Sequence, residues 1–145
     1  MIYVDADSCP VKDIILKVAK EYNEKVIFYF DQSHYYESDY AIVRIVEKDK
    51  DSVDMYILKE IKENEILVTG DYGLGALALA KKTLVITPNG LILDNNNIDF
   101  HLTTRYEHAI ARKANKHVKG PRKRKSIDDE KFEVSLRKLL EVYNA

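Results

Sequence analysis

The sequence predicts an α/β protein built on a mainly parallel sheet with helices on both of its faces. Short apolar segments typical of buried strands alternate with segments whose apolar residues recur every three or four positions, as in amphipathic helices. Strands that alternate with helices in this way form βαβ units, in which neighbouring strands run parallel. A length of 145 residues fits one domain, so we expect residues 1–145 to fold as a single unit.

The elements of the first half follow from apolar spacing and from residue types that begin helices. Residues 2–4 are apolar, and residues 25–30 and 42–46 are rich in β-branched and aromatic side chains, so all three predict strands. Pro10 is typical of a first helical turn, and Ser52 is a typical N-cap. We therefore expect strands at 2–4, 25–30 and 42–46, and helices at 10–23 and 52–63.

The second half continues the alternation. Residues 66–68 are all apolar and are followed by Thr69. Such a run is typical of strands that are buried on both faces of a parallel sheet. The turn Gly70-Asp71-Tyr72-Gly73 leads into a helix rich in alanine and leucine, and Ser126 opens the last helix with a capping-box pattern. We expect strands at 66–69 and 83–86, and helices at 74–82, 97–116 and about 127–143.

The net charge of −1 conceals a strong asymmetry along the chain. Residues 1–111 carry 12 Lys or Arg and 19 Asp or Glu, whereas residues 112–125, the basic segment, carry 8 basic and no acidic side chains. Such a block attracts polyanions, so RNA or DNA is a candidate partner. Basic side chains also suit a solvated helix C-terminus, and the composition does not separate the two readings. The residues that would contact nucleic acid are Lys119, Arg122, Lys123, Arg124 and Lys125.

Composition predicts a cytoplasmic protein that does not interact with membranes. The single cysteine, Cys9, cannot form an internal disulfide, so nothing favours an oxidising compartment. No apolar run approaches the length of a membrane span, and the N-terminus lacks the basic and apolar regions of a signal peptide.

Acidic residues follow several of the predicted strands. Asp5 and Asp7 come after the first strand, Asp54 lies in the first turn of the helix after 42–46, and Asp71 follows 66–69. The ends of parallel strands meet at one edge, where open α/β sheets bind ligands. Carboxylates gathered there repel one another, and Mg²⁺ or Mn²⁺ relieves the repulsion. Any single Asp is more often a helix cap, but four at one edge favour a metal site.

Four segments resemble the YaiI/YqxD family of small bacterial proteins, in order and over nearly the whole chain. They are Val4-Asp5-Ala6-Asp7-Ser8-Cys9-Pro10-Val11, Asp51-Ser52-Val53-Asp54-Met55-Tyr56-Ile57, Ile66-Leu67-Val68-Thr69-Gly70-Asp71 and Lys119-Gly120-Pro121. That family is similar to PIN-like domains, the fold of many metal-dependent nucleases. The resemblance implies a three-layer sandwich with an acidic pocket of Asp5, Asp54 and Asp71, supported by Thr69.

The activity that the resemblance implies is a divalent-metal-dependent nuclease or phosphodiesterase acting on RNA or DNA. Asp5, Asp54 and Asp71 would be catalytic, and Asp7 would join them around the metal. Two departures stand out: PIN nucleases commonly have a further acid shortly after the third motif, which Tyr72-Gly73-Leu74-Gly75 lacks, and Lys119 replaces the first glycine of the family's Gly-Gly-Pro element. The missing acid favours the alternative, a non-catalytic nucleic-acid-binding or regulatory protein of the same fold.

Asp5-Ala6-Asp7 is also similar to the motif of the haloacid dehalogenase phosphatases, in which one Asp is the nucleophile and the other the general acid. In that family the later motifs come from different strands. Thr69 and Asp71 are only two residues apart, so this interpretation is the weaker one.

Overall fold

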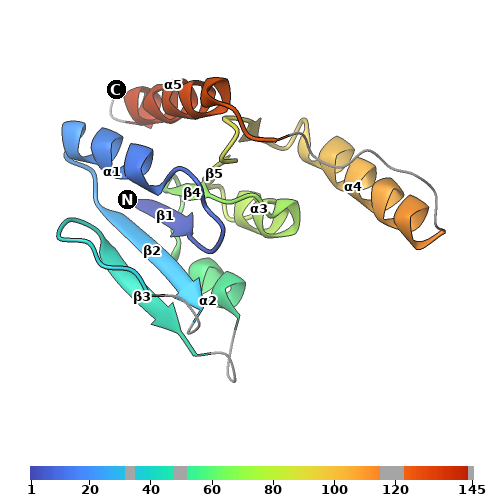
Figure 1. The fold of residues 1–145 in the computed structure, drawn as a ribbon, viewed down its shortest axis with the longest axis horizontal. Helices are drawn as coiled ribbons and strands as arrows, with labels where there is room; N and C mark the ends of the chain where they lie inside the picture. The colour runs from blue at the N-terminus through green and yellow to red at the C-terminus, as the bar shows by residue number, and fades with distance from the viewer. Residues whose placement is uncertain (32–34, 48–51, 115–122, 144–145) are drawn as a thin grey trace.

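The computed structural model describes residues 1–31, 35–47, 52–114 and 123–143, and all structural statements below refer to these ranges. Within them, a six-stranded sheet is accompanied by five helices (Figure 1). The elements are, in order, β1 (Ile2–Asp5), α1 (Lys12–Glu21), β2 (Val26–Asp31), β3 (Ile42–Val46), α2 (Val53–Glu60), β4 (Ile66–Val68), α3 (Tyr72–Leu79), β5 (Leu84–Ile86), β6 (Ile92–Leu93), α4 (Ile98–Lys113) and α5 (Ser126–Tyr143).

The sheet has the strand order β3-β2-β1-β4-β5-β6. Strands β1 to β5 pair in parallel, and β6 pairs with β5 in the antiparallel direction. The predicted α/β class with a mainly parallel sheet is therefore confirmed. β6 was not predicted, because its two residues are too few to form a periodic pattern. The carboxyl ends of β1 to β5 lie along one side of the sheet, here called the carboxyl edge.

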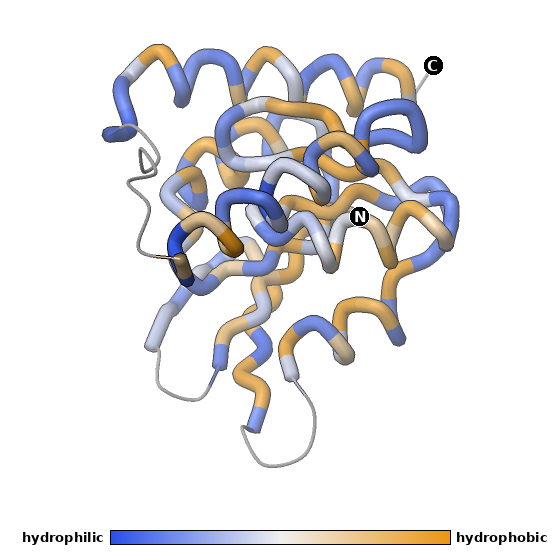
Figure 2. The backbone as a smooth tube through the Cα atoms, turned by 90° about the vertical axis from the view of Figure 1, so that its right-hand side faces the viewer, coloured by the Kyte–Doolittle hydropathy of each residue, from blue (hydrophilic) through white to orange (hydrophobic). Residues whose placement is uncertain are grey.

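Helices cover both faces of the sheet, which gives three layers (Figure 1). Side chains alternate along β1, so Ile2 and Val4 lie on one face and Tyr3 lies on the other. Ile2 and Val4 belong to a buried cluster that includes residues of α1 and α5. Tyr3 belongs to a second cluster with residues of α2, α3 and α4. Figure 2 shows hydrophilic and hydrophobic residues alternating along α5, the helix that leads to the C-terminus.

Several helices begin or end at other residues than predicted. α1 begins at Lys12 rather than at Pro10, because the preceding residues form turns in which Ser8 has a φ of 60°. α2 ends at Glu60, since the backbone of the next residue is extended. α3 begins at Tyr72, two residues earlier than predicted. The last of these differences makes Asp71, which follows β4, the N-cap of α3.

α4 is less covered by other elements than the rest of the fold, and its end lies apart from the sheet (Figure 1). Ile98 is buried, and Leu102 packs against the cluster that contains α3. Phe100 and Tyr106 are 70% and 68% exposed. In the ranges that the structure describes, no helix is long and apolar enough to cross a membrane.

Candidate functional site

Three carboxylates from different segments meet at the carboxyl edge. Asp5 is the last residue of β1, Asp54 lies in the first turn of α2, and Asp71 is the N-cap of α3. The negative charges of Asp54 and Asp71 act on Asp5, and a hydrogen bond joins the carboxyls of Asp54 and Asp71. Asp5, Asp54 and Asp71, three of the four acids predicted at this edge, therefore lie close enough for their charges to act on one another. We call Asp5, Asp54 and Asp71 the acidic triad.

Thr69 connects two members of the acidic triad. Its side chain is buried, with 1% of its surface exposed. Its hydroxyl donates to Oδ2 of Asp5 over 2.9 Å and accepts from the backbone N–H of Asp71 over 3.0 Å. One hydroxyl thus fixes both the carboxylate at the end of β1 and the backbone that begins α3.

Asp71 is a helix cap as well as a member of the triad. Its Oδ1 accepts from the backbone N–H groups of Gly73 at 2.9 Å and Leu74 at 3.2 Å. The structural alternative raised by the sequence is therefore correct for Asp71. It is not correct for Asp54, because the N-cap of α2 is Ser52. The Ser52 hydroxyl accepts from the backbone N–H of Met55 at 3.3 Å.

Burial and mutual repulsion raise the pKa values of two triad members. Burial is the main reason that the pKa of Asp5 rises from 3.8 to about 6; the hydrogen bond from Thr69 opposes the rise, and the charges of Asp54, Asp71 and Asp7 add to it. Burial also raises the pKa of Asp54, as do the charge and the hydrogen bond of Asp71. The site therefore gathers more negative charge than its surroundings stabilise, and a bound cation would relieve that imbalance.

Asp7 lies beside the triad and also contributes to the fold. Its Oδ2 accepts from the backbone N–H of Asp31 at 3.1 Å, which ties the loop after β1 to the end of β2. The following residue, Ser8, adopts a left-handed backbone conformation that is uncommon for a residue with a side chain. The loop thus turns sharply and keeps Asp7 close enough for its charge to act on Asp5.

The donor set suits a hard divalent cation. Carboxylate oxygens are the ligands of Mg²⁺ and Mn²⁺, and Mg²⁺ is usually bound through one or two carboxylates while it keeps several waters. Within the described residues, no three or more His, Cys, Asp or Glu side chains are arranged so that they hold an ion between them. A site here would therefore centre on Asp54 and Asp71, the two carboxyls that interact directly, and a cation would offset the charge of Asp71 that acts on Asp54.

The basic segment is only partly within the described residues: Lys119 and Arg122 lie outside them. Arg124 is intermediate in exposure, and its guanidinium contacts Asp129 at 2.6 Å, Asn89 Oδ1 at 2.8 Å and the carbonyl of Pro88 at 3.0 Å. This arginine therefore holds the turn before β6 against the start of α5. The neighbouring Lys123 and Lys125 are exposed.

A cluster beside Asp71 was not assigned from the sequence. The guanidinium carbon of Arg105 lies 4.6 Å from the centre of the Tyr72 ring, and its Nη2 donates to the carbonyl of Gly70 at 3.4 Å. The rings of Tyr72 and His101 are 5.4 Å apart. The spacing of His101 and Arg105 places both on one face of a helix, but their contact with Asp71's neighbours depends on how α4 packs on α3.

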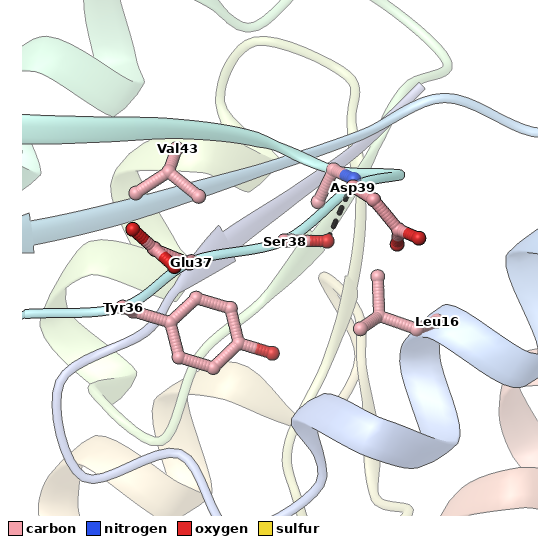
Figure 3. A pocket seen from close by; sticks show the side chains of 7 residues that line it. Leu16, Tyr36, Glu37, Ser38, Asp39 and Val43 are labelled. Atoms are coloured by element: carbon pink, nitrogen blue, oxygen red, sulfur yellow. Dashed lines mark hydrogen bonds between the residues drawn. The ribbon is translucent and has the colours of Figure 1, made fainter.

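A separate surface pocket, of about 760 Å³, lies away from these carboxylates (Figure 3). It is formed by Leu16 of α1 and by residues of the segment that leads into β3, among them Tyr36, Glu37 and Asp39. It therefore lies near the beginning of β3, whereas the triad follows the ends of strands. No member of the acidic triad lines it.

Fold and site together define a class: a three-layer α/β protein whose parallel strands deliver carboxylates to one edge. The sequence model of the uncharacterised YaiI/YqxD family matches residues 3–142. The chain belongs to this family, as its four motifs indicated.

The chain is also similar to curated bacterial proteins named only as UPF0178 proteins. It is 44% identical over 140 residues to one from Natranaerobius thermophilus, covering 96% of this chain and 95% of that protein. It is 41% identical over 144 residues to one from Clostridium perfringens, covering 99% and 97%. It is 44% identical over 142 residues to one from Lachnoclostridium phytofermentans, covering 96% and 95%. No solved structure matches the chain.

Proposed function

We propose that this protein is a divalent-metal-dependent phosphodiesterase that cleaves RNA or DNA. The observation that carries the proposal is the electrostatic coupling of Asp5, Asp54 and Asp71 at the carboxyl edge, with Thr69 joining Asp5 to the backbone of Asp71. Raised carboxyl pKa values beside like charges are typical of sites that bind cations or move protons. The similarity of the family to PIN-like domains points to phosphodiester chemistry.

Asp54 and Asp71 would hold Mg²⁺ or Mn²⁺, with Asp5 and Asp7 next to them. The chemistry that such an ion supplies is the activation of a water molecule and the neutralisation of charge on the phosphate during in-line attack. The protein's own part is positional. Thr69 fixes the carboxylate of Asp5, and the two N–H groups at the start of α3 fix that of Asp71.

Cleavage of a labelled single-stranded RNA and DNA with Mn²⁺, with Mg²⁺ and with EDTA tests the proposal. We expect metal-dependent products from the wild type and a loss of at least about 100-fold in rate for Asp71→Asn. Asparagine is as good an N-cap as aspartate, so this variant keeps the cap of α3. The control is Asp13→Asn, which removes an equal charge from the exposed first turn of α1.

The assay also separates the enzyme from its alternative. If neither ion supports cleavage of any strand, the non-catalytic nucleic-acid-binding or regulatory protein replaces the phosphodiesterase. Cleavage that Asp71→Asn leaves unchanged would contradict the assignment of the triad.

A further inference from the structure

Four side chains form a stripe along one face of α4. His101, Arg105, His108 and Arg112 are spaced by four, three and four residues, which places them on one side of a helix. Over these positions a helix rises by about 16 Å. Arg105, His108 and Arg112 are exposed. We call this set the α4 stripe.

The α4 stripe begins next to the acidic triad. Arg105 packs on the ring of Tyr72 and donates to the carbonyl of Gly70, the two residues that flank Asp71. Arg105 therefore already lies at the first residue of α3, and the turns of α4 that follow it are exposed. In Figure 1 the end of α4 lies apart from the sheet. The stripe thus leads from the carboxylates out along an uncovered helix.

Aromatic rings lie at the inner end of the stripe. The His101 ring is 5.4 Å from that of Tyr72 and 5.4 Å from that of Phe100. Phe100 is 70% exposed although it is among the most apolar side chains of α4. Exposed rings beside arginines are the combination with which proteins bind unpaired bases and the backbone between them.

We infer that α4 binds the substrate as a single strand, an inference that rests on the proposed function. Phe100 and His101 stack with unpaired bases beside the triad. The α4 stripe contacts the phosphates of the nucleotides that follow. Charge favours a nucleic acid at this face, because Arg105 and Arg112 are exposed along the stripe and the basic segment begins at Arg112. Duplex bases are already stacked on each other and gain little from exposed rings.

Binding in EDTA tests this inference independently of cleavage. Fluorescence anisotropy measures the affinity of the full chain for a labelled 12-nucleotide RNA, for the DNA of the same sequence and for the corresponding duplex. We expect both single strands to bind more tightly than the duplex. Phe100→Ala should weaken single-strand binding at least about fivefold, the lower end for the loss of one stacked base. RNA and DNA should respond alike.

Two substitutions at the end of α4 form a matched pair. Arg112→Gln removes a charge from the α4 stripe, and Lys113→Gln removes an equal charge from the adjacent exposed position, which lies off the stripe. Arg112→Gln should lower the slope of log affinity against log salt by about 0.7, the value for one phosphate contact of a single strand. Lys113→Gln should change the slope by less than half as much.

Equal effects of the two substitutions, tighter binding of the duplex, or an unchanged affinity in Phe100→Ala would each overturn the inference. So would sedimentation that shows a dimer which Phe100→Ala converts to monomers, because this face would then bind a second copy. If Phe100→Ala and Arg112→Gln weaken binding as expected but the wild type cleaves no strand, the inference about α4 stands and the proposed phosphodiesterase activity is wrong.

Discussion

The hydroxyl of Thr69 donates a hydrogen bond of 2.9 Å to Oδ2 of Asp5, which joins the end of β4 to the end of β1 where the carboxylates meet. The same oxygen accepts from the N–H of Asp71. A residue that contributes no charge therefore determines how two charged residues are placed, and it offers a way to disturb the site without removing a carboxylate.

Thr69→Val should lower the free energy of unfolding by about 1–3 kcal/mol, because the N–H of Asp71 and the carboxylate of Asp5 each lose a partly buried hydrogen bond. It should also raise the pKa of Asp5 above about 6, since the hydrogen bond from Thr69 lowers that pKa in the wild type. Urea unfolding gives the first quantity, and a carbon-detected NMR titration of the carboxyls gives the second.

The matched control is Thr83→Val. Thr83 is also buried, and its hydroxyl donates to the carbonyl of Ala78 at 2.9 Å, in the connection between α3 and β5 rather than at Asp5. We expect a comparable loss of stability and no change in the pKa of Asp5. If both variants shift that pKa equally, the bond between Thr69 and Asp5 does not set it.

The raised pKa of Asp5 predicts how stability depends on pH without metal. The pKa of Asp5 is about 6 in the folded chain and has its ordinary value of 3.8 in the unfolded chain. Between these two pH values the folded state therefore binds more protons than the unfolded state. Its contribution is fully present below pH 3.8 and is lost as pH rises through 6, by up to about 3 kcal/mol. Asp5→Asn should remove this loss and stabilise the metal-free protein at pH 7. Urea unfolding from pH 4 to 7 measures it, and an Asn variant less stable than wild type at pH 7 would contradict it.

Arg124 and Lys123 are neighbours with different expected roles. Arg124→Gln should lower the free energy of unfolding by about 0.5–1.5 kcal/mol, because it removes contacts with Asp129, Asn89 and Pro88 that are partly exposed to solvent. Lys123→Gln, at an exposed position, should change stability by less than about 0.5 kcal/mol. Thermal unfolding of both variants provides the comparison, and equal losses would show that the contacts of Arg124 do not stabilise the fold.

The fold was predictable where each element carries its own signal. The apolar strands and the helices with regular apolar spacing define the parallel sheet, and the position of strand ends predicts that Asp5, Asp54 and Asp71 share an edge. β6 was not predictable, because its two residues have no pattern and pair only once β5 is in place.

The details of the site depend on three-dimensional packing. The hydrogen bond between the Asp54 and Asp71 carboxyls requires α2 and α3 to lie side by side, which no local signal specifies. The contact of Arg105 with Tyr72 likewise depends on where α4 packs. Sequence spacing gives the face of a helix on which a residue lies, but not the neighbour that this face meets.

Counting bound Mn²⁺ by electron paramagnetic resonance at pH 7.5 tests the central claim that the acidic triad binds a divalent metal. Titration of the wild type should show at least one Mn²⁺ per chain, and the same ion should raise the melting temperature by mass action. Asp71→Asn should weaken binding at least about tenfold, whereas Asp13→Asn should leave it unchanged. No bound Mn²⁺ at millimolar concentration, or equal binding by wild type and Asp71→Asn, would contradict the claim.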